Sequence, residues 1–156
     1  MKLSLILASI LSMTSLNASY PIMEEKKCIS IMEEEIEYDE TDSYHKECYA
    51  TTVAEGVNVE GPSRIDSMTT LINIIPMKNI IIYNYRVTLP KKLHSKTAAI
   101  SKTLKQSNIK SNCESKDVED YMLGMGVDIV HSYYMKNGDL LTSFKINKEV
   151  CANLKK

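Results

Sequence analysis

The chain has 156 residues, 25% of them charged, and a formal net charge of −1. This size supports one domain with one modest core. The near-zero net charge gives no reason to expect nucleic acid as a partner. Beyond the N-terminal segment, no stretch is long and apolar enough to span a bilayer.

The first residues have the pattern of a secretory signal peptide. Lys2 precedes a short apolar run, and small residues follow it up to Ala18. This pattern predicts cleavage after Ala18, which leaves a single domain over residues 19–156. A membrane anchor is the alternative, but the apolar run is short for one, and no cysteine follows it that could carry a lipid. We therefore expect a periplasmic or secreted protein.

Charge is unevenly distributed along the rest of the chain. Residues 22–60 contain twelve acidic and three basic residues, a net charge of −9, and residues 61–156 contain eight acidic and fifteen basic residues, a net charge of +7. Mutual attraction of the two halves within one fold is the simpler interpretation, because surface charge usually serves solubility. A basic binding face is the alternative.

Two helices are predicted in the acidic N-terminal part, residues 22–60. Apolar residues approximate a helical stripe over 23–37, although a strand over 28–32 is an alternative. The glutamates Glu33, Glu34, Glu35 and Glu37 lack the spacing of an EF-hand, so we expect a solvated helix face rather than a calcium site. A second helical face runs from Tyr44 towards Val57, and Gly61-Pro62-Ser63 terminates it.

Residues 68–151 are predicted to form the sheet. Residues 69–75 and 80–87 are rich in β-branched residues, and 76–79 connects them as a hairpin. Residues 127–133 alternate between apolar and polar, and 140–146 returns after Asn137-Gly138, which suits a type I′ turn. These two hairpins predict the α+β class, with an antiparallel sheet of about four strands and helices packed on one face.

Helices are also predicted on either side of Cys113. Ser95 can cap a helix that runs to about Asn108. Residues 114–123 follow with helical spacing, and Ser115 can cap them. Gly124 and Gly126 are stop signals, because glycine adopts the left-handed conformation at low cost.

Four cysteines follow the signal segment, at Cys28, Cys48, Cys113 and Cys151. An even number in an exported protein predicts two disulfides, for which three pairings exist. We favour Cys28–Cys48 and Cys113–Cys151, because each pair brackets one structural unit. Free or metal-bound thiols are the alternative, but no Cys-x-x-Cys spacing supports zinc or redox chemistry.

Residues 53–151 contain a layout of turn, strand and cysteine residues: Asn58, Pro62, Asp66, Thr69 or Thr70, Leu71, Tyr83, Tyr85, Cys113, Gly126, Ile129, Tyr133, Gly138 and Cys151. This layout resembles that of a loose group of small exported bacterial proteins of unknown function, with paired Tyr-x-Tyr strands and a C-terminal Cys pair. His131 departs by standing where the first tyrosine of the second pair would be, and the spacing from Asp66 to Leu71 is looser. The resemblance implies the fold and export, and it implies no mechanism.

No motif predicts a catalytic residue, a metal or a cofactor. His131 alternates with apolar residues on a strand beside Tyr133, where a packed and hydrogen-bonded side chain is expected rather than a catalyst. His45 and His94 lie in polar stretches and have no ligand spacing. Gly124-Met125-Gly126 lacks the lysine and hydroxyl residue of a phosphate-binding loop.

The candidate binding surface therefore comprises basic and aromatic residues: Lys91, Lys92, Lys96, Lys102, Lys105, Lys110, Tyr83, Tyr85 and Tyr133. Packing of the tyrosines under a helix is the alternative for that part of the set. The predicted function is a non-enzymatic module that binds a macromolecule, with an anionic envelope protein or polymer as partner. A small periplasmic hydrolase or redox enzyme, or an inhibitor of a cell-wall enzyme, is the alternative, and a deep pocket with converging polar groups would favour the enzyme.

Overall fold

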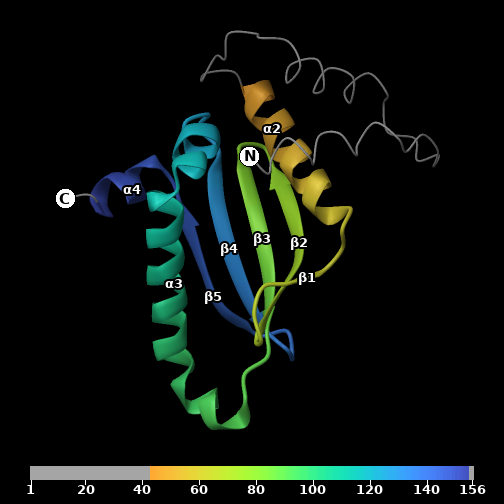
Figure 1. Cartoon of the computed structure of the whole chain (residues 1–156), viewed down its shortest axis with the longest axis vertical. Coiled ribbons are helices and arrows are strands. Elements are labelled where there is room, and N and C mark those ends of the chain that lie inside the picture. Colours follow the sequence, from red (N-terminus) through yellow and green to blue (C-terminus); the bar gives the residue numbers. More distant parts are fainter. Residues whose placement is uncertain (1–42, 155–156) are drawn as a thin grey trace.

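The structure is a computed structural model that describes residues 43–154. The predicted signal peptide, the acidic segment over 23–37 and Cys28 lie outside these residues. Within them, five strands form one sheet in the order β1-β2-β3-β4-β5 (Figure 1). The strands are β1 (Ser63–Arg64), β2 (Thr69–Met77), β3 (Ile80–Val87), β4 (Asp128–Met135) and β5 (Leu140–Ile146). The α+β class is confirmed, and the very short β1 is the strand beyond the four expected.

The two predicted hairpins are joined through a parallel pair of strands. β2 pairs antiparallel with β3, and β4 pairs antiparallel with β5, whereas β3 and β4 run parallel. The sheet is thus mostly antiparallel, with one parallel pair that side-chain alternation could not indicate. A parallel pair needs a long crossover, and residues 88–127 supply one. It contains the 3₁₀ helix η3 (Lys91–Lys96), the α-helix α3 (Thr97–Glu114) and the π-helical turn η4 (Val118–Leu123).

Helices cover one face of the sheet, as predicted. The helix α2 (Ser43–Asn58) contacts β2 and β3, α3 contacts β5, and α4 (Lys148–Leu154) contacts α3. Figure 1 shows α2 and α3 in front of the same face. That face carries the buried side chains Leu71, Ile74, Ile81, Val87, Ile129, Phe144 and Ile146. Their burial supplies most of the apolar driving force for holding the helices against the sheet.

Asn58, the last residue of α2, closes the outer edge of β2. Its Nδ2 donates to the Ile74 carbonyl at 2.7 Å, and its Oδ1 accepts from the Ile74 backbone N–H at 2.7 Å. The side-chain amide therefore replaces a neighbouring strand at this point, since β1 reaches only Leu71 and Thr70. Backbone groups of Pro76, two residues on, face the same outer side, so its missing N–H costs no ladder bond. This explains why β2 continues to Met77, past the connection expected at 76–79.

The crossover helix differs from its prediction at both ends. Ser95 does not cap it, because Ser95 lies inside η3, and α3 begins at Thr97 with Lys96 as its N-cap residue. The 3₁₀ turn starts where the Leu93 N–H donates to the Pro90 carbonyl at 2.8 Å. The helix also continues past Asn108 to Glu114, so that Cys113 lies in its last turn rather than opening the next element.

The segment after α3 is helical but wound as a π-helix. Ser115 accepts the Val118 N–H through Oγ at 3.4 Å, which agrees with its predicted capping role. Gly126 has a φ of 70°, as expected of a stop signal. Gly124 instead has a right-handed φ of −54°, and a Cβ there would collide with the carbonyl oxygen of Asp120. Gly124 is therefore needed for space rather than for a left-handed conformation.

A disulfide joins Cys113 of α3 to Cys151 of α4, which confirms the predicted pair. Both residues are buried, and their Cα atoms are 5.2 Å apart. In the chain-entropy model, a closed loop of this length stabilises the fold by about 3–4 kcal/mol. Cys48 is also disulfide-bonded, and its predicted partner Cys28 lies outside the described residues.

The turn between β4 and β5 is not the predicted type I′ turn. Gly138 has a φ of 93°, but Asn137 does not have the positive φ that such a turn requires. The Gly138 N–H donates to the Met135 carbonyl at 2.9 Å, and the Met135 N–H donates to the Asp139 carbonyl at 2.8 Å. Asn137 bonds through its side chain instead, where Nδ2 donates to Asp139 Oδ2 at 2.7 Å. These bonds stabilise a longer loop in which only Gly138 is left-handed.

Candidate binding surface

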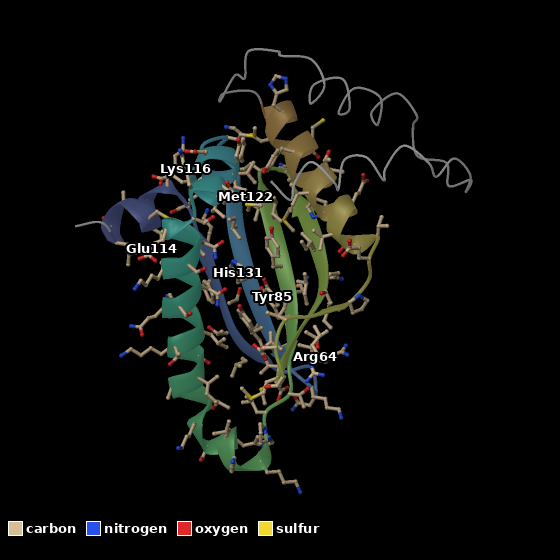
Figure 2. The ribbon with its side chains drawn as sticks, viewed as in Figure 1. Arg64, Tyr85, Glu114, Lys116, Met122 and His131 are labelled. Atoms are coloured by element: carbon tan, nitrogen blue, oxygen red, sulfur yellow. A yellow bond between two sulfur atoms is a disulfide. The ribbon has the colours of Figure 1, made fainter. Side chains whose placement is uncertain are left out.

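A row of stacked rings crosses the covered face of the sheet. It comprises Tyr83 and Tyr85 of β3, His131 and Tyr133 of β4, and Phe144 of β5. Strand pairing sets Tyr83 opposite His131, Tyr85 opposite Tyr133, and His131 opposite Phe144. Ring centroids lie 4.6 Å apart for Tyr85 and Tyr133, and 5.6 Å apart for His131 and Phe144. Figure 2 shows Tyr85 and His131 near the middle of the sheet, between α3 and α2.

His131 is a buried and hydrogen-bonded side chain, as the sequence predicted. It is 5% exposed, and its Nδ1 lies 3.1 Å from the hydroxyl oxygen of Tyr85. Its Nε2 lies 3.5 Å from the side-chain nitrogen of Asn112 on α3. Burial lowers the pKa of His131 from 6.5 to about 4, because the charged imidazolium loses its hydration. The ring is therefore neutral at neutral pH.

The candidate tyrosines belong to this buried row. Tyr85 is 9% exposed and Tyr133 is 3% exposed. Burial raises the pKa of Tyr83 to about 12 and raises the pKa values of Tyr85 and Tyr133 as well. In this conformation Tyr85 and Tyr133 pack beneath the helices and do not face a partner.

The candidate lysines, by contrast, are all exposed. Lys91, Lys92 and Lys96 lie on η3, and Lys102, Lys105 and Lys110 lie on α3. Lys110 makes an exposed ion pair with Glu114 at 3.9 Å, which is worth little in water. Residues 88–113 include all six lysines and no Asp or Glu. The structure thus brings the basic part of the predicted surface together on one crossover and separates it from the tyrosines.

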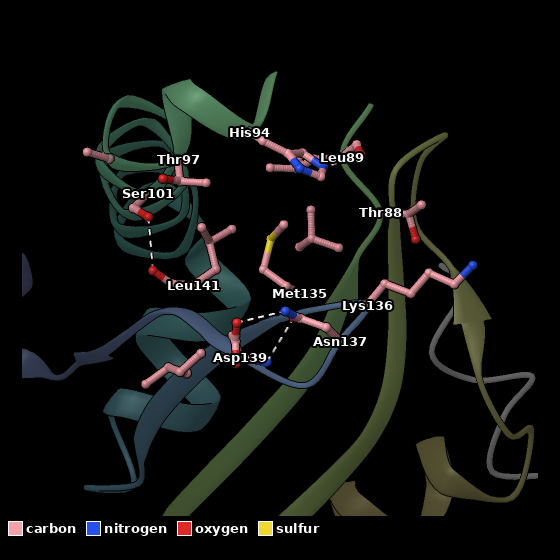
Figure 3. A pocket seen from close by; sticks show the side chains of 13 residues that line it. Thr88, Leu89, His94, Thr97, Ser101, Met135, Lys136, Asn137, Asp139 and Leu141 are labelled. Atoms are coloured by element: carbon pink, nitrogen blue, oxygen red, sulfur yellow. Dashed lines mark hydrogen bonds between the residues drawn. The ribbon is translucent and has the colours of Figure 1, made fainter. Parts of the chain in front are cut away.

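A groove opens where β3 and β4 end. The two strands are parallel and in register, so that Val87 and Met135 end side by side. The chain leaves β3 towards η3 and leaves β4 into the turn to β5, and the space between these exits is the carboxyl-end groove (Figure 3). Its lining residues are Val87, Thr88, Leu89, His94, Thr97, Ala98, Ser101, Met135, Lys136, Asn137, Asp139, Leu140 and Leu141.

Hydrogen bonds fix the two walls of this groove. The His94 Nε2–H donates to the Leu89 carbonyl at 3.1 Å, since a carbonyl can only accept. Ser101 Oγ donates to the Leu141 carbonyl at 3.0 Å and ties α3 to β5. Side-chain alternation along the sequence could not indicate this groove, because alternation does not distinguish a parallel from an antiparallel pair of strands. The long segment between residues 87 and 127 is the signal that could have indicated a parallel pair.

The opposite face of the sheet carries a second depression, and no helix in the described part of the chain lines it. Ile72, Ile75, Ile82, Val130 and Tyr134 are among its lining residues. Nearby polar side chains pair with one another: Asn84 donates to Asn73 at 2.9 Å, and Lys145 forms an ion pair with Asp128 at 2.6 Å. These polar side chains satisfy one another on a solvent-facing surface, so their presence does not indicate a ligand site.

Residues 43–154 contain no group of three or more His, Cys, Asp or Glu side chains arranged to hold a metal ion. None of the helices in that range has the length and apolar character needed to cross a membrane.

No protein-family model matches the chain, and no curated relative matches it. Three solved structures are similar in fold. EpsS, a pilotin from the type 2 secretion system of Vibrio vulnificus, superposes with a TM-score of 0.60 and 17% identity, over 70% of this chain and 94% of its own. A candidate secreted protein from Pseudomonas aeruginosa superposes with a TM-score of 0.57 and 15% identity, over 70% of this chain and 95% of its own. AspS, a type II secretion pilotin from Vibrio cholerae, superposes with a TM-score of 0.54 and 16% identity, over 70% of this chain and 94% of its own. At these identities the likeness shows a shared fold and no more.

Proposed function

We propose that this chain is an exported, non-enzymatic module that binds another protein of the bacterial envelope. The observation that carries the proposal is the fold that it shares with two secretion-system pilotins, over nearly the whole length of each. The predicted signal peptide and the Cys113–Cys151 disulfide suit an oxidising compartment such as the periplasm.

Membership of the loose group of exported proteins with paired Tyr-x-Tyr strands is part of this proposal. Several residues of that layout have structural roles here that any protein of this design would need. Asn58 closes the edge of β2, and Gly138 adopts the left-handed conformation of a turn. Asp66 accepts the backbone N–H groups of Met68 and Thr69, which lowers the pKa of its carboxyl group. These roles support a structural rather than a catalytic reason for the resemblance.

The partner is proposed to carry negative charge where it meets η3 and α3. The six exposed lysines lie within residues 88–113, which contain no Asp or Glu, so η3 and most of α3 are locally cationic. Exposed charges are screened within about 8 Å at physiological salt, so an interaction through them weakens as salt is added.

The test uses the full-length tagged chain produced in a bacterium with a periplasm. Fractionation should recover it from the periplasm or medium, and cross-linking followed by affinity purification should recover a specific envelope protein. Reversing Lys102 and Lys105 to glutamate should reduce that capture by on the order of tenfold, because two attractive charges become repulsive. The matched control reverses Lys78 and Lys116, two exposed lysines outside η3 and α3.

The proposal fails if the chain stays in the cytoplasm or if no envelope protein is specifically captured. The role of the lysines fails separately, if both reversal pairs capture the partner equally at low and at high salt.

A further inference from the structure

The carboxyl-end groove has an apolar floor that remains partly open to solvent. Val87 and Leu89 are buried beneath it, and Met135 and Leu141 are half-buried. Leu140, also a lining residue, is 57% exposed. An aliphatic side chain placed here would exclude water from both itself and these residues, which is the main source of affinity for a small apolar group.

The surroundings of the groove are cationic on the side of η3 and α3. Lys91, Lys92 and Lys96 are exposed on η3 beside the lining residue His94, although none of the three lines the groove itself. Lys136 is the one lysine among the lining residues. Asp139 is the one acidic lining residue; it accepts a hydrogen bond from Asn137 and lies in the same turn as Lys136. A ligand with carboxylates beside its apolar group would be attracted to the lysines of η3 and α3.

The hydrogen-bonding groups suit a peptide. Thr88 and Thr97 line the groove, and their hydroxyl groups can exchange hydrogen bonds with a peptide backbone. The Leu141 carbonyl at the start of β5 is occupied by Ser101, so an incoming segment would lie in the groove rather than extend the sheet at that point.

We propose that the carboxyl-end groove binds an acidic peptide segment of the partner by inserting one of its aliphatic side chains between η3–α3 and the β4–β5 turn. The inference rests on the proposed function for its biological partner, but its chemistry can be tested without that partner.

The direct test is an NMR titration of the mature chain, uniformly labelled with ¹⁵N. The probe is a short synthetic peptide in which one leucine is flanked by glutamates. Saturable shifts are expected at groove residues, including Leu89, Ser101 and Asn137. Two matched peptides, one with serine in place of the leucine and one with glutamines in place of the glutamates, should each bind at least about tenfold more weakly, the ratio that corresponds to 1.4 kcal/mol.

Neighbouring alanines on α3 provide matched variants. Ala98 and Ala99 are both exposed, but only Ala98 lines the groove. Ala98→Phe should fill the floor and abolish the saturable shifts, whereas Ala99→Phe should bind the peptide as the parent does. Thermal unfolding of both variants shows whether the fold is retained.

The proposal is overturned if the peptide shifts residues elsewhere, if the serine peptide binds as well as the leucine peptide, or if Ala98→Phe and Ala99→Phe bind equally. Preferential binding of the chain to phosphatidylglycerol vesicles, blocked by Ala98→Phe, would also overturn it, since the groove would then serve a lipid. Specific peptide binding without any captured envelope protein would contradict the proposed function and leave the groove assignment intact.

Discussion

Replacing His131 by tyrosine should remove a large part of the acid sensitivity of the fold. In the native protein the imidazole is 5% exposed and its pKa is lowered to about 4, whereas in the unfolded chain it titrates near 6.5. The unfolded state therefore takes up the proton first as the pH falls. Stability is complete above pH 6.5 and declines as the pH drops towards 4.

The size of the effect follows from the shift in pKa. Each pKa unit corresponds to 1.36 kcal/mol. The drop in pKa from 6.5 to about 4 therefore lowers the free energy of unfolding by about 3 kcal/mol once the pH is below both values. Carboxylates titrate in the same pH range and affect both proteins. The measured quantity is therefore the difference in the free energy of unfolding between the parent chain and His131→Tyr. We expect that difference to change by about 3 kcal/mol between pH 7 and pH 4, in urea unfolding followed by circular dichroism.

Attraction between a charged His131 and the rings stacked on it would oppose the effect of burial. The rings of Tyr83, Tyr85 and Phe144 stack on His131, and aromatic faces can stabilise a cation. If that attraction offsets the lost hydration, the parent and His131→Tyr will show parallel pH profiles, and the assignment of a depressed pKa to His131 is refuted. Asn73→Ala is the control, because it removes one exposed side-chain hydrogen bond and no titratable group, so its difference from the parent chain should not vary with pH.

Two further changes test the backbone interpretation. Asn58→Ala should lower the free energy of unfolding by about 1–3 kcal/mol, since it removes both hydrogen bonds to Ile74. The control Asn73→Ala loses one exposed side-chain hydrogen bond and should change the free energy of unfolding by less than about 0.5 kcal/mol. Equal losses in the two variants would mean that Asn58 does not close the sheet edge. Gly138→Val should cost about 1–3 kcal/mol because Gly138 has a φ of 93°, and an unchanged melting temperature would show that the turn adopts another conformation.

Local patterns predicted most of the fold because each depends on neighbouring residues. Alternation over 80–87 and 140–146 gave the strands β3 and β5 with their observed ends. Helical spacing after Tyr44 gave α2, and the cysteine count with the bracketing argument gave the Cys113–Cys151 pair.

The parts that the patterns missed depend on contacts between distant segments. Alternation is the same in parallel and antiparallel strands, so it could not show that β3 runs parallel to β4. The carboxyl-end groove was missed for the same reason. The tyrosines were ambiguous because a ring at an alternating position can face the core or a partner, and only the placement of α2 and α3 decides between them.

The Cys113–Cys151 disulfide also determines what a broken chain would do. The bond encloses β4, the exposed turn at 136–139 and β5 in one covalent ring. A protease that cut this turn would open the ring without releasing either fragment, so that a nicked molecule would keep its mass under non-reducing conditions and fall apart only after reduction. The same tether would let the turn accept a fluorescent reporter beside the carboxyl-end groove, with both flanking strands held in place.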